Sequence, residues 1–199
     1  MSAMTAYQAL FEHASLPRTK GGAKGKKVFV TAASGGVGVW VVQLAKWAGA
    51  EVVGTASKAN EEFVKSLGAS EVLDYRGVDV KEWAKEPGNQ ADVVVDCIGG
   101  NSLRDAWFVV KEGGVLISVF QPPEGVRPKE VEGKGVKDLF FVMEPRGEEL
   151  DVVTSGLDEG RFVANLDSVF PLERFEEAFE KLESGRTRGK IVIDFGVEE

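Results

Sequence analysis

The sequence has little of what disulfide frameworks, zinc sites and membrane spans require. Its 199 residues include one cysteine, Cys97, and one histidine, His13. One cysteine excludes an internal disulfide and fits a reducing compartment, so we expect a cytoplasmic protein. One Cys and one His are also too few for the Cys/His ligand sets that hold zinc. No apolar run approaches bilayer length and no signal-peptide pattern opens the chain, so we expect no membrane association.

Basic charge is also scarce. The 24 Lys and Arg residues stand against 32 Asp and Glu, and the formal net charge is −8. This balance argues against nonspecific binding to nucleic acid or to an anionic membrane. The exception is the stretch 18–27 (RTKGGAKGKK), where no acid accompanies the positive charges. Its glycines, and its place between two periodic segments, predict a solvated loop.

Apolar strands alternate with helical segments along most of the chain. Strands this apolar are typical of a parallel sheet that is buried on both faces, and the alternation predicts right-handed crossovers. We therefore predict an α/β fold, a doubly wound Rossmann sheet forming one domain over residues 1–199. The linker 121–137 is predicted to be a loop near the ligand crevice. The predicted strands are 28–31, 51–55, 71–73, 92–96, 115–120 and 190–195, with a short extended piece at 162–169. The predicted helices are 3–13, 36–49, 60–67, 80–85, 102–111, 145–159 and 172–184.

A glycine-rich loop, AASGGVG at 32–38, follows the first strand and opens a helix. Glycine permits the sharp turn, lets the backbone approach a pyrophosphate and lets the helix pack closely on the strand. Ala33, Gly35 and Gly38 occupy the three fingerprint positions, so alanine replaces the first glycine. The context of strand, loop, helix and second strand is the one that a dinucleotide site requires.

The second strand indicates which dinucleotide is bound. An NAD site places an acid at the end of this strand to hold the ribose 2′-hydroxyl. Here the strand runs into Ser57 and Lys58 instead. A hydroxyl and a cation suit a 2′-phosphate, which a carboxylate would repel. The sequence thus favours NADPH over NADH.

Longer motifs resemble those of a known family. AASGGVG, GTASK, LGASEVLDYR, DVVVDCIGG, KEGGVLIS, FFVMEP and VFPLERFEEAFEKLESGRTRGKIV occur in this order. Together they resemble the zinc-independent quinone oxidoreductase and enoyl reductase branch of the medium-chain dehydrogenase/reductase superfamily. The resemblance covers almost all of the chain except the basic loop and 121–137.

The resemblance implies an enzyme in which NADPH donates hydride to a quinone or to the β-carbon of an α,β-unsaturated carbonyl. The backbone N–H groups of Gly35–Val37 would bind the pyrophosphate, and Lys58 would meet the 2′-phosphate. Tyr75 would lie against the adenosine half. Cys97 would line the nicotinamide path as a small buried side chain, with phenylalanines flanking the nicotinamide. The predicted cofactor-binding residues are Ser34, Gly35, Gly36, Val37, Ser57, Lys58, Tyr75, Cys97, Phe120, Phe141 and Val142, and no catalytic residue is assigned.

The chain also departs from the family pattern. Family members begin with a barrel-like catalytic domain, whereas residues 1–27 resemble the helix that leads out of it, followed by the basic loop. The tail, 162–199, resembles the segment that packs back on that domain. We therefore expect cofactor binding with weak turnover by this chain alone. The resemblance also implies a homodimer joined at Rossmann sheet edges, for which 138–143 (DLFFVM) is the most apolar candidate.

Two other functions remain open from the residues. One is a non-redox enzyme that performs cyclisation, isomerisation or dehydration on the same scaffold. Its candidate acid/base groups, Asp96, Glu124 and Tyr75, form no convincing pair by spacing. The other is a non-catalytic module that senses the nucleotide and binds a protein partner. His13 lies on the first helix, far in sequence from the glycine loop, and is interpreted as structural.

Overall fold

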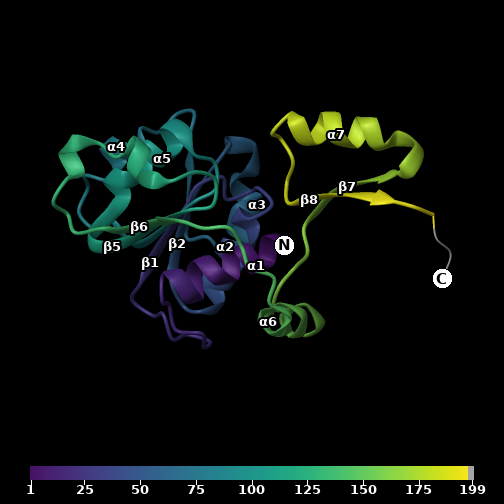
Figure 1. Cartoon of the computed structure of the whole chain (residues 1–199), viewed down its shortest axis with the longest axis horizontal. Coiled ribbons are helices and arrows are strands. Elements are labelled where there is room, and N and C mark those ends of the chain that lie inside the picture. Colours follow the sequence, from purple (N-terminus) through teal and green to yellow (C-terminus); the bar gives the residue numbers. More distant parts are fainter. Residues whose placement is uncertain (197–199) are drawn as a thin grey trace.

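Six parallel strands form the main sheet of the computed structural model, which describes residues 1–196 (Figure 1). Their order is β3-β2-β1-β4-β5-β6, so the direction of winding reverses between β1 and β4. This arrangement confirms the predicted doubly wound Rossmann sheet. The strands are β1 Lys27–Val30, β2 Glu51–Ala56, β3 Glu71–Asp74, β4 Ala91–Asp96, β5 Val110–Ser118 and β6 Lys137–Phe140.

Both faces of this sheet are buried, as the continuous apolar strands predict. In β1, Val28 and Val30 join one core cluster and Phe29 joins the other, because successive side chains point to opposite faces. Helices α1, α2 and α6 contribute to the first core, and α4 and α5 cover the second (Figure 1). No helix within residues 1–196 is long and apolar enough to cross a bilayer. The helices of this part are α1 Ser2–Tyr7, η1 Gln8–His13, α2 Gly38–Trp47, η2 Lys58–Asn60, α3 Glu61–Ser66, α4 Val80–Trp83, α5 Gly100–Val109, η3 Pro123–Val126, η4 Lys129–Val131 and α6 Gly147–Asp158.

The leading helix widens halfway along. It is α-helical in α1 and π-helical in η1. The buried Gln8, where the winding changes, donates to the Glu144 carbonyl (2.8 Å) and to a Glu149 carboxylate oxygen (2.6 Å), and accepts from the Glu144 N–H (3.1 Å). These bonds hold the linker after β6 and the start of α6 against the leading helix. His13 packs on Phe141, with 4.3 Å between ring centroids, which supports its structural interpretation.

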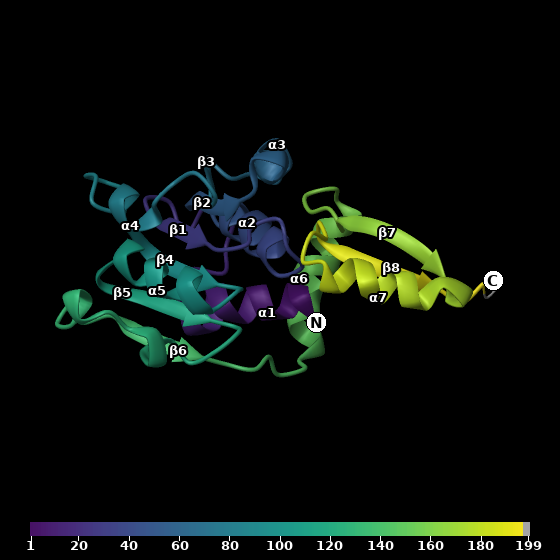
Figure 2. The same ribbon diagram turned by 90° about the horizontal axis from the view of Figure 1, so that it is seen from above.

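The tail forms a separate β-α-β unit beside the Rossmann body (Figure 2). Strands β7 Leu166–Pro171 and β8 Lys190–Asp194 pair in parallel, and η5 Leu172–Arg174 and α7 Phe175–Glu183 connect them. The last three residues of the predicted tail, 197–199, lie outside the described residues. Many apolar side chains of this unit are exposed, because within residues 1–196 nothing covers them. They are Val163, Leu166, Val169, Leu172, Phe175, Phe179, Leu182, Val192 and Phe195.

Candidate functional site

A cavity of about 960 Å³ opens at the carboxyl ends of the strands, where the winding of the sheet reverses. Open α/β sheets bind ligands at this position, because the loops after neighbouring strands diverge there. The glycine loop, the segments that follow β2 and β3, the beginning of α5 and the tail loop 185–188 all contribute to the cavity. Its polar and glycine lining comprises Thr31, Ser34, Gly35, Thr55, Ser57, Asn60, Tyr75, Arg76, Asp79, Lys81, Asn101, Ser102, Asp105, Gly185, Arg186, Thr187 and Arg188.

The glycine loop begins with a strained residue and close backbone packing. Ala32 has a φ of 50°, a left-handed conformation that non-glycine residues rarely adopt. A Cβ at Gly38 would lie 2.3 Å from the Ala32 carbonyl oxygen, so helix α2 can approach β1 only with glycine there. Ala33 stands where the fingerprint has its first glycine, and a Cβ at Gly54 would lie 2.6 Å from the Ala33 Cβ. The missing side chain on β2 therefore makes room for the alanine.

Part of this loop presents free backbone donors. The Gly35 N–H closes a turn onto the Ala32 carbonyl (2.9 Å). No described acceptor takes the N–H of Gly36 or Val37, which precede the first turn of α2. The Lys190 ammonium lies close to Gly36, because a Cβ built on this glycine would be 2.5 Å from the Lys190 Nζ. Lys190 is exposed as a residue, yet desolvation lowers the pKa of its ammonium group.

Hydrogen bonds join the tail to the body at this cavity. The Gly189 N–H donates to the Ser34 carbonyl (3.0 Å). The Arg188 guanidinium donates to the Asn60 side-chain oxygen (2.5 Å) and to the Ala59 carbonyl (3.1 Å). Asn60 in turn donates to the Ser34 hydroxyl (3.1 Å). The tail loop thus forms one wall of the cavity and contacts the glycine loop there.

Several predicted cofactor residues meet here, and Lys58 points elsewhere. Ser34, Gly35, Ser57 and Tyr75 line the cavity. The Lys58 side chain is 77% exposed, pairs with Glu61 and is absent from the lining. Hydrogen bonds from Lys58 and Lys65 lower the pKa of Glu61 to about 2.

The residues predicted for the nicotinamide end lie outside this cavity. Phe120 and Val142 are 62% and 75% exposed, and Phe141 is half-buried against His13. The Cys97 N–H donates to the Thr31 hydroxyl (2.9 Å). Desolvation, followed by the negative charge of Asp96, raises the pKa of the Cys97 thiol. Cys97 is partly buried and packs against the first core cluster, so it is less enclosed than the sequence predicts.

Asp96, which the sequence offers as a candidate acid/base group, is the centre of a buried hydrogen-bond network. It is fully buried, and its carboxylate accepts from the Thr31 hydroxyl (2.8 Å), the Ser118 hydroxyl (2.9 Å) and the Gly99 N–H (2.9 Å). These bonds connect the ends of β1, β4 and β5. A buried carboxylate whose oxygens accept three hydrogen bonds positions the surrounding loops.

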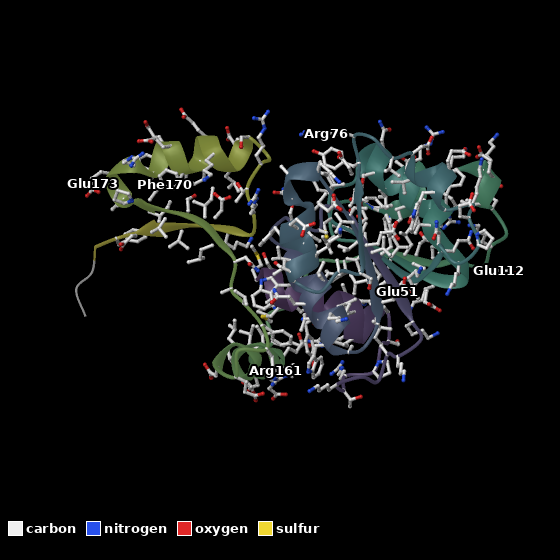
Figure 3. All side chains as sticks on the ribbon, turned by 180° about the vertical axis from the view of Figure 1, so that it is seen from behind. Glu51, Arg76, Glu112, Arg161, Phe170 and Glu173 are labelled. Atoms are coloured by element: carbon white, nitrogen blue, oxygen red, sulfur yellow. The ribbon has the colours of Figure 1, made fainter. Side chains whose placement is uncertain are left out.

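Sequence reasoning missed the arginines of the cavity. Arg76 follows Tyr75 directly, with its guanidinium carbon 5.4 Å from the Tyr75 ring centroid, and Figure 3 shows it on the Rossmann body. Arg186 and Arg188 belong to the GRTRGK motif in the tail, far in sequence from the glycine loop. Arg76 could have been predicted from the sequence, because it directly follows Tyr75 in the LDYR motif. The tail arginines required the tertiary structure.

The described residues offer no metal site. Within residues 1–196, no three His, Cys, Asp or Glu side chains cluster so that they could hold an ion. The donor set therefore does not fit zinc.

Comparison with known proteins places this fold and site in a family. The zinc-binding dehydrogenase family model matches residues 67–193. A probable zinc-binding oxidoreductase, mitochondrial, of Arthroderma benhamiae is 50% identical over 198 residues, 97% of this chain and 60% of the relative. The chloroplast envelope quinone oxidoreductase homolog of Arabidopsis thaliana is 35% identical over 199 residues, 98% of this chain and 60% of the relative. The quinone oxidoreductase structure from Coxiella burnetii superposes with a TM-score of 0.84 at 30% identity, covering 97% of this chain and 58% of that one.

The fold and the cavity define a Rossmann unit of the dehydrogenase type. The chain belongs to the zinc-binding dehydrogenase family, within the medium-chain dehydrogenase/reductase superfamily, and corresponds to its C-terminal, Rossmann-containing portion. It spans about 60% of the length of the curated relatives described above.

Proposed function

We propose that this chain is the NADPH-binding part of an oxidoreductase that reduces a quinone or an α,β-unsaturated carbonyl. One observation carries the proposal: the cavity beside the glycine loop is lined by Arg76, Arg186 and Arg188, and the segment after β2 supplies Ser57 and no acid. Arginines match phosphate oxygens in geometry and charge. The similarity to quinone oxidoreductases supports the reaction class.

The chain's own residues fit the two phosphate positions of the cofactor. The N–H groups of Gly36 and Val37, with the Lys190 ammonium above them, suit the pyrophosphate. Ser57 and Arg188 suit the 2′-phosphate. Lys58, which the sequence predicts for that role, would have to leave Glu61 to reach it.

When bound, NADPH would supply a hydride to the acceptor. The residues described above would hold and orient the cofactor, and the Asp96 network would fix the loops at the strand ends. We propose that the reaction needs no zinc, as the resemblance of the motifs to the zinc-independent branch of the superfamily implies.

We further propose that turnover by this chain alone is weak. Phe120 and Val142, predicted to flank the nicotinamide, are largely exposed, and hydride transfer benefits from a site that excludes water. The uncovered apolar side of the tail supports the prediction that another domain packs on it. The cytoplasmic location stays a prediction, since the two curated relatives described above carry organelle names.

A homodimer is proposed through strand β6. This strand lies at the end of the six-stranded sheet, so its outer side is an open edge. Phe140 on this strand is exposed and adds apolar surface there.

The test is a calorimetric titration of the purified chain with NADPH and, in a separate experiment, with NADH. We expect saturable NADPH binding and NADH binding weaker by about tenfold or more, because only NADPH carries the 2′-phosphate. Arg188→Ala should weaken NADPH binding by about tenfold and leave NADH nearly unchanged. Lys58→Ala, measured in parallel, decides whether that lysine contributes.

The matched control is Arg174→Ala. Arg174 is an arginine of the tail that pairs with Glu177 and is absent from the cavity lining, so its loss should leave both affinities unchanged. Binding of neither nucleotide would reject the proposal and favour a non-redox enzyme or an interaction module. NADPH binding without reduction of any quinone or enone, even in a longer form of the protein, would favour the sensing module.

A further inference from the structure

The tail loop lines the cavity with arginines, whereas the side formed by α4 and α5 also carries carboxylates. Arg186 and Arg188 lie beside η2, where Arg188 bonds Asn60. On the other side, α4 and α5 lie together (Figure 1) and contribute Asp79 and Asp105. A ligand that fits both sides carries anionic groups at one end and a hydrogen-bond donor at the other.

Asp105 is the available acceptor on the α4–α5 side. Asp79 already caps α4, accepting from the Glu82 N–H (3.0 Å). Lys81 is directed elsewhere, with its ammonium 4.3 Å from the Phe108 ring centroid and 3.6 Å from a Glu130 oxygen. Asp105 is half-buried, and no described residue donates a hydrogen bond to it or pairs with it. Desolvation, followed by the charge of Asp79, raises the pKa of its carboxyl group, as expected of an acceptor without a partner.

Apolar side chains accompany these carboxylates. Val78, Val80 and Ile98 line the same cavity, with Phe29 at its base. Ile98 is 51% exposed and contributes apolar surface to the cavity wall. Apolar walls with one polar acceptor suit a flat aromatic ring that has an amine on its edge.

We propose that Asp105 accepts a hydrogen bond from the exocyclic amine of the adenine ring, so that the site selects 6-aminopurine over 6-oxopurine dinucleotides. This inference rests on the proposed function, which places an adenine dinucleotide in the cavity. The amine donates to a carboxylate, whereas a 6-oxo group turns its lone pairs toward the negative charge. Asp105 thereby determines specificity at the end of the ligand away from the phosphates.

Calorimetric titration with NADPH and with its hypoxanthine analogue, which carries a 6-oxo group, tests this inference. We expect the native chain to bind NADPH about tenfold more tightly than the analogue. Asp105→Ala should lose that factor for NADPH and keep the affinity for the analogue. Asp105→Asn should bind both within about twofold, because its amide offers both a donor and an acceptor. Asp79→Asn, which retains a capping side chain, is the matched control and should keep the preference.

The possible results distinguish a failure of the role of Asp105 from a failure of the proposed function. Equal affinity of the native chain for both dinucleotides, or an unchanged preference in both Asp105 variants, would overturn the role of Asp105 and leave NADPH binding intact. Loss of the preference in Asp79→Asn alone would also overturn it, by assigning the amine contact to Asp79. Binding of neither compound to the native chain would overturn the proposed function, and this inference with it. If Asp105→Ala fails to fold, as judged by its thermal transition, the nearly isosteric Asp105→Asn still decides the question.

Discussion

The Lys190 ammonium lies so close to Gly36 that a Cβ on the glycine would stand 2.5 Å from Nζ. Lys190 begins β8 in the tail, and Gly36 lies in the glycine loop before α2. The two residues are far apart in sequence, and the tail brings them together when Gly189 bonds Ser34. No carboxylate within residues 1–196 pairs with this cation, which lies beside the free N–H groups that suit a pyrophosphate.

Removing this cation should weaken dinucleotide binding without affecting the choice between dinucleotides. We expect Lys190→Ala to reduce the affinity for NADPH and for NADH by a similar factor of about ten, since both carry the pyrophosphate. Calorimetric titration measures this. Lys24→Ala, an exposed lysine of the basic loop, serves as the control. A loss for NADPH alone would instead place Lys190 at the 2′-phosphate.

Gly54 and Ala33 should be energetically coupled. A methyl group at Gly54 would collide with the Ala33 Cβ, so Gly54→Ala should destabilise the fold by about 2 kcal/mol. Adding Ala33→Gly removes the collision and should restore most of that loss. Urea unfolding of the two single variants and the double variant measures the coupling. Simple additivity would show that the two sites do not share this contact.

The buried Asp96 should contribute strongly to stability. Asp96→Ala leaves two hydroxyls and one N–H without their acceptor, so we expect a loss of about 3 kcal/mol in the free energy of unfolding. Asp158→Ala, an exposed acid at the end of α6, should cost far less. If chemical denaturation gives similar values for both variants, the network does not hold the strand ends as described.

Asp92 should make the fold sensitive to acid. Burial by itself would raise the pKa of this carboxyl group, but the Lys27 N–H and the ammonium groups of Lys111 and Lys26 outweigh burial and hold the pKa below its usual 3.8. A carboxyl with a depressed folded-state pKa adds stability above its unfolded pKa, and that stability is lost as the pH falls through the folded value. Asp92→Asn should therefore cost about 1 to 2 kcal/mol at pH 7 and less at a pH below 3.8, the more so the further the pH falls. Urea unfolding at both pH values measures the difference, and an equal cost at both would contradict the assignment.

The open edge of β6 should carry the dimer. Native protein should sediment with the mass of two chains of 21.5 kDa each. Phe140→Lys puts a charge on the exposed apolar edge and should shift the protein to one chain, with unchanged thermal stability of the monomer fold. Phe179→Lys, on the exposed side of α7, is the matched control. If only the control variant dissociates the dimer, the interface lies on the tail.

Local chemistry made much of the fold predictable. Strand β1 is a continuous apolar run in the sequence, and such runs are typical of a parallel sheet that is buried on both faces. In the structure, Val28 and Val30 belong to one core and Phe29 to the other. Strand β6 was less accessible to prediction. Its four residues follow an irregular linker and lack a strong pattern, so the sequence indicated only an apolar edge near residues 138–143.

The site was predictable on the side formed by the segments that directly follow the first three strands. Ser34, Gly35, Ser57 and Tyr75 follow successive strands, and the carboxyl ends of parallel strands meet at one edge of the sheet. Lys58 shows where this reasoning stops, because its position after β2 was correct while its ammonium pairs with Glu61. Side-chain direction depends on neighbouring charges, which a motif does not specify.

By itself, the sequence determined that the chain forms a doubly wound sheet with a glycine loop at the end of its first strand, because hydrophobic period and turn chemistry are local properties. Only the tertiary structure decided that Arg188 of the tail reaches η2, that Lys190 reaches the glycine loop, and that Asp105 of α5 lines the same cavity. Those contacts join segments more than a hundred residues apart or on different faces of the sheet. Their formation depends on how the elements pack, which no local stretch of residues encodes.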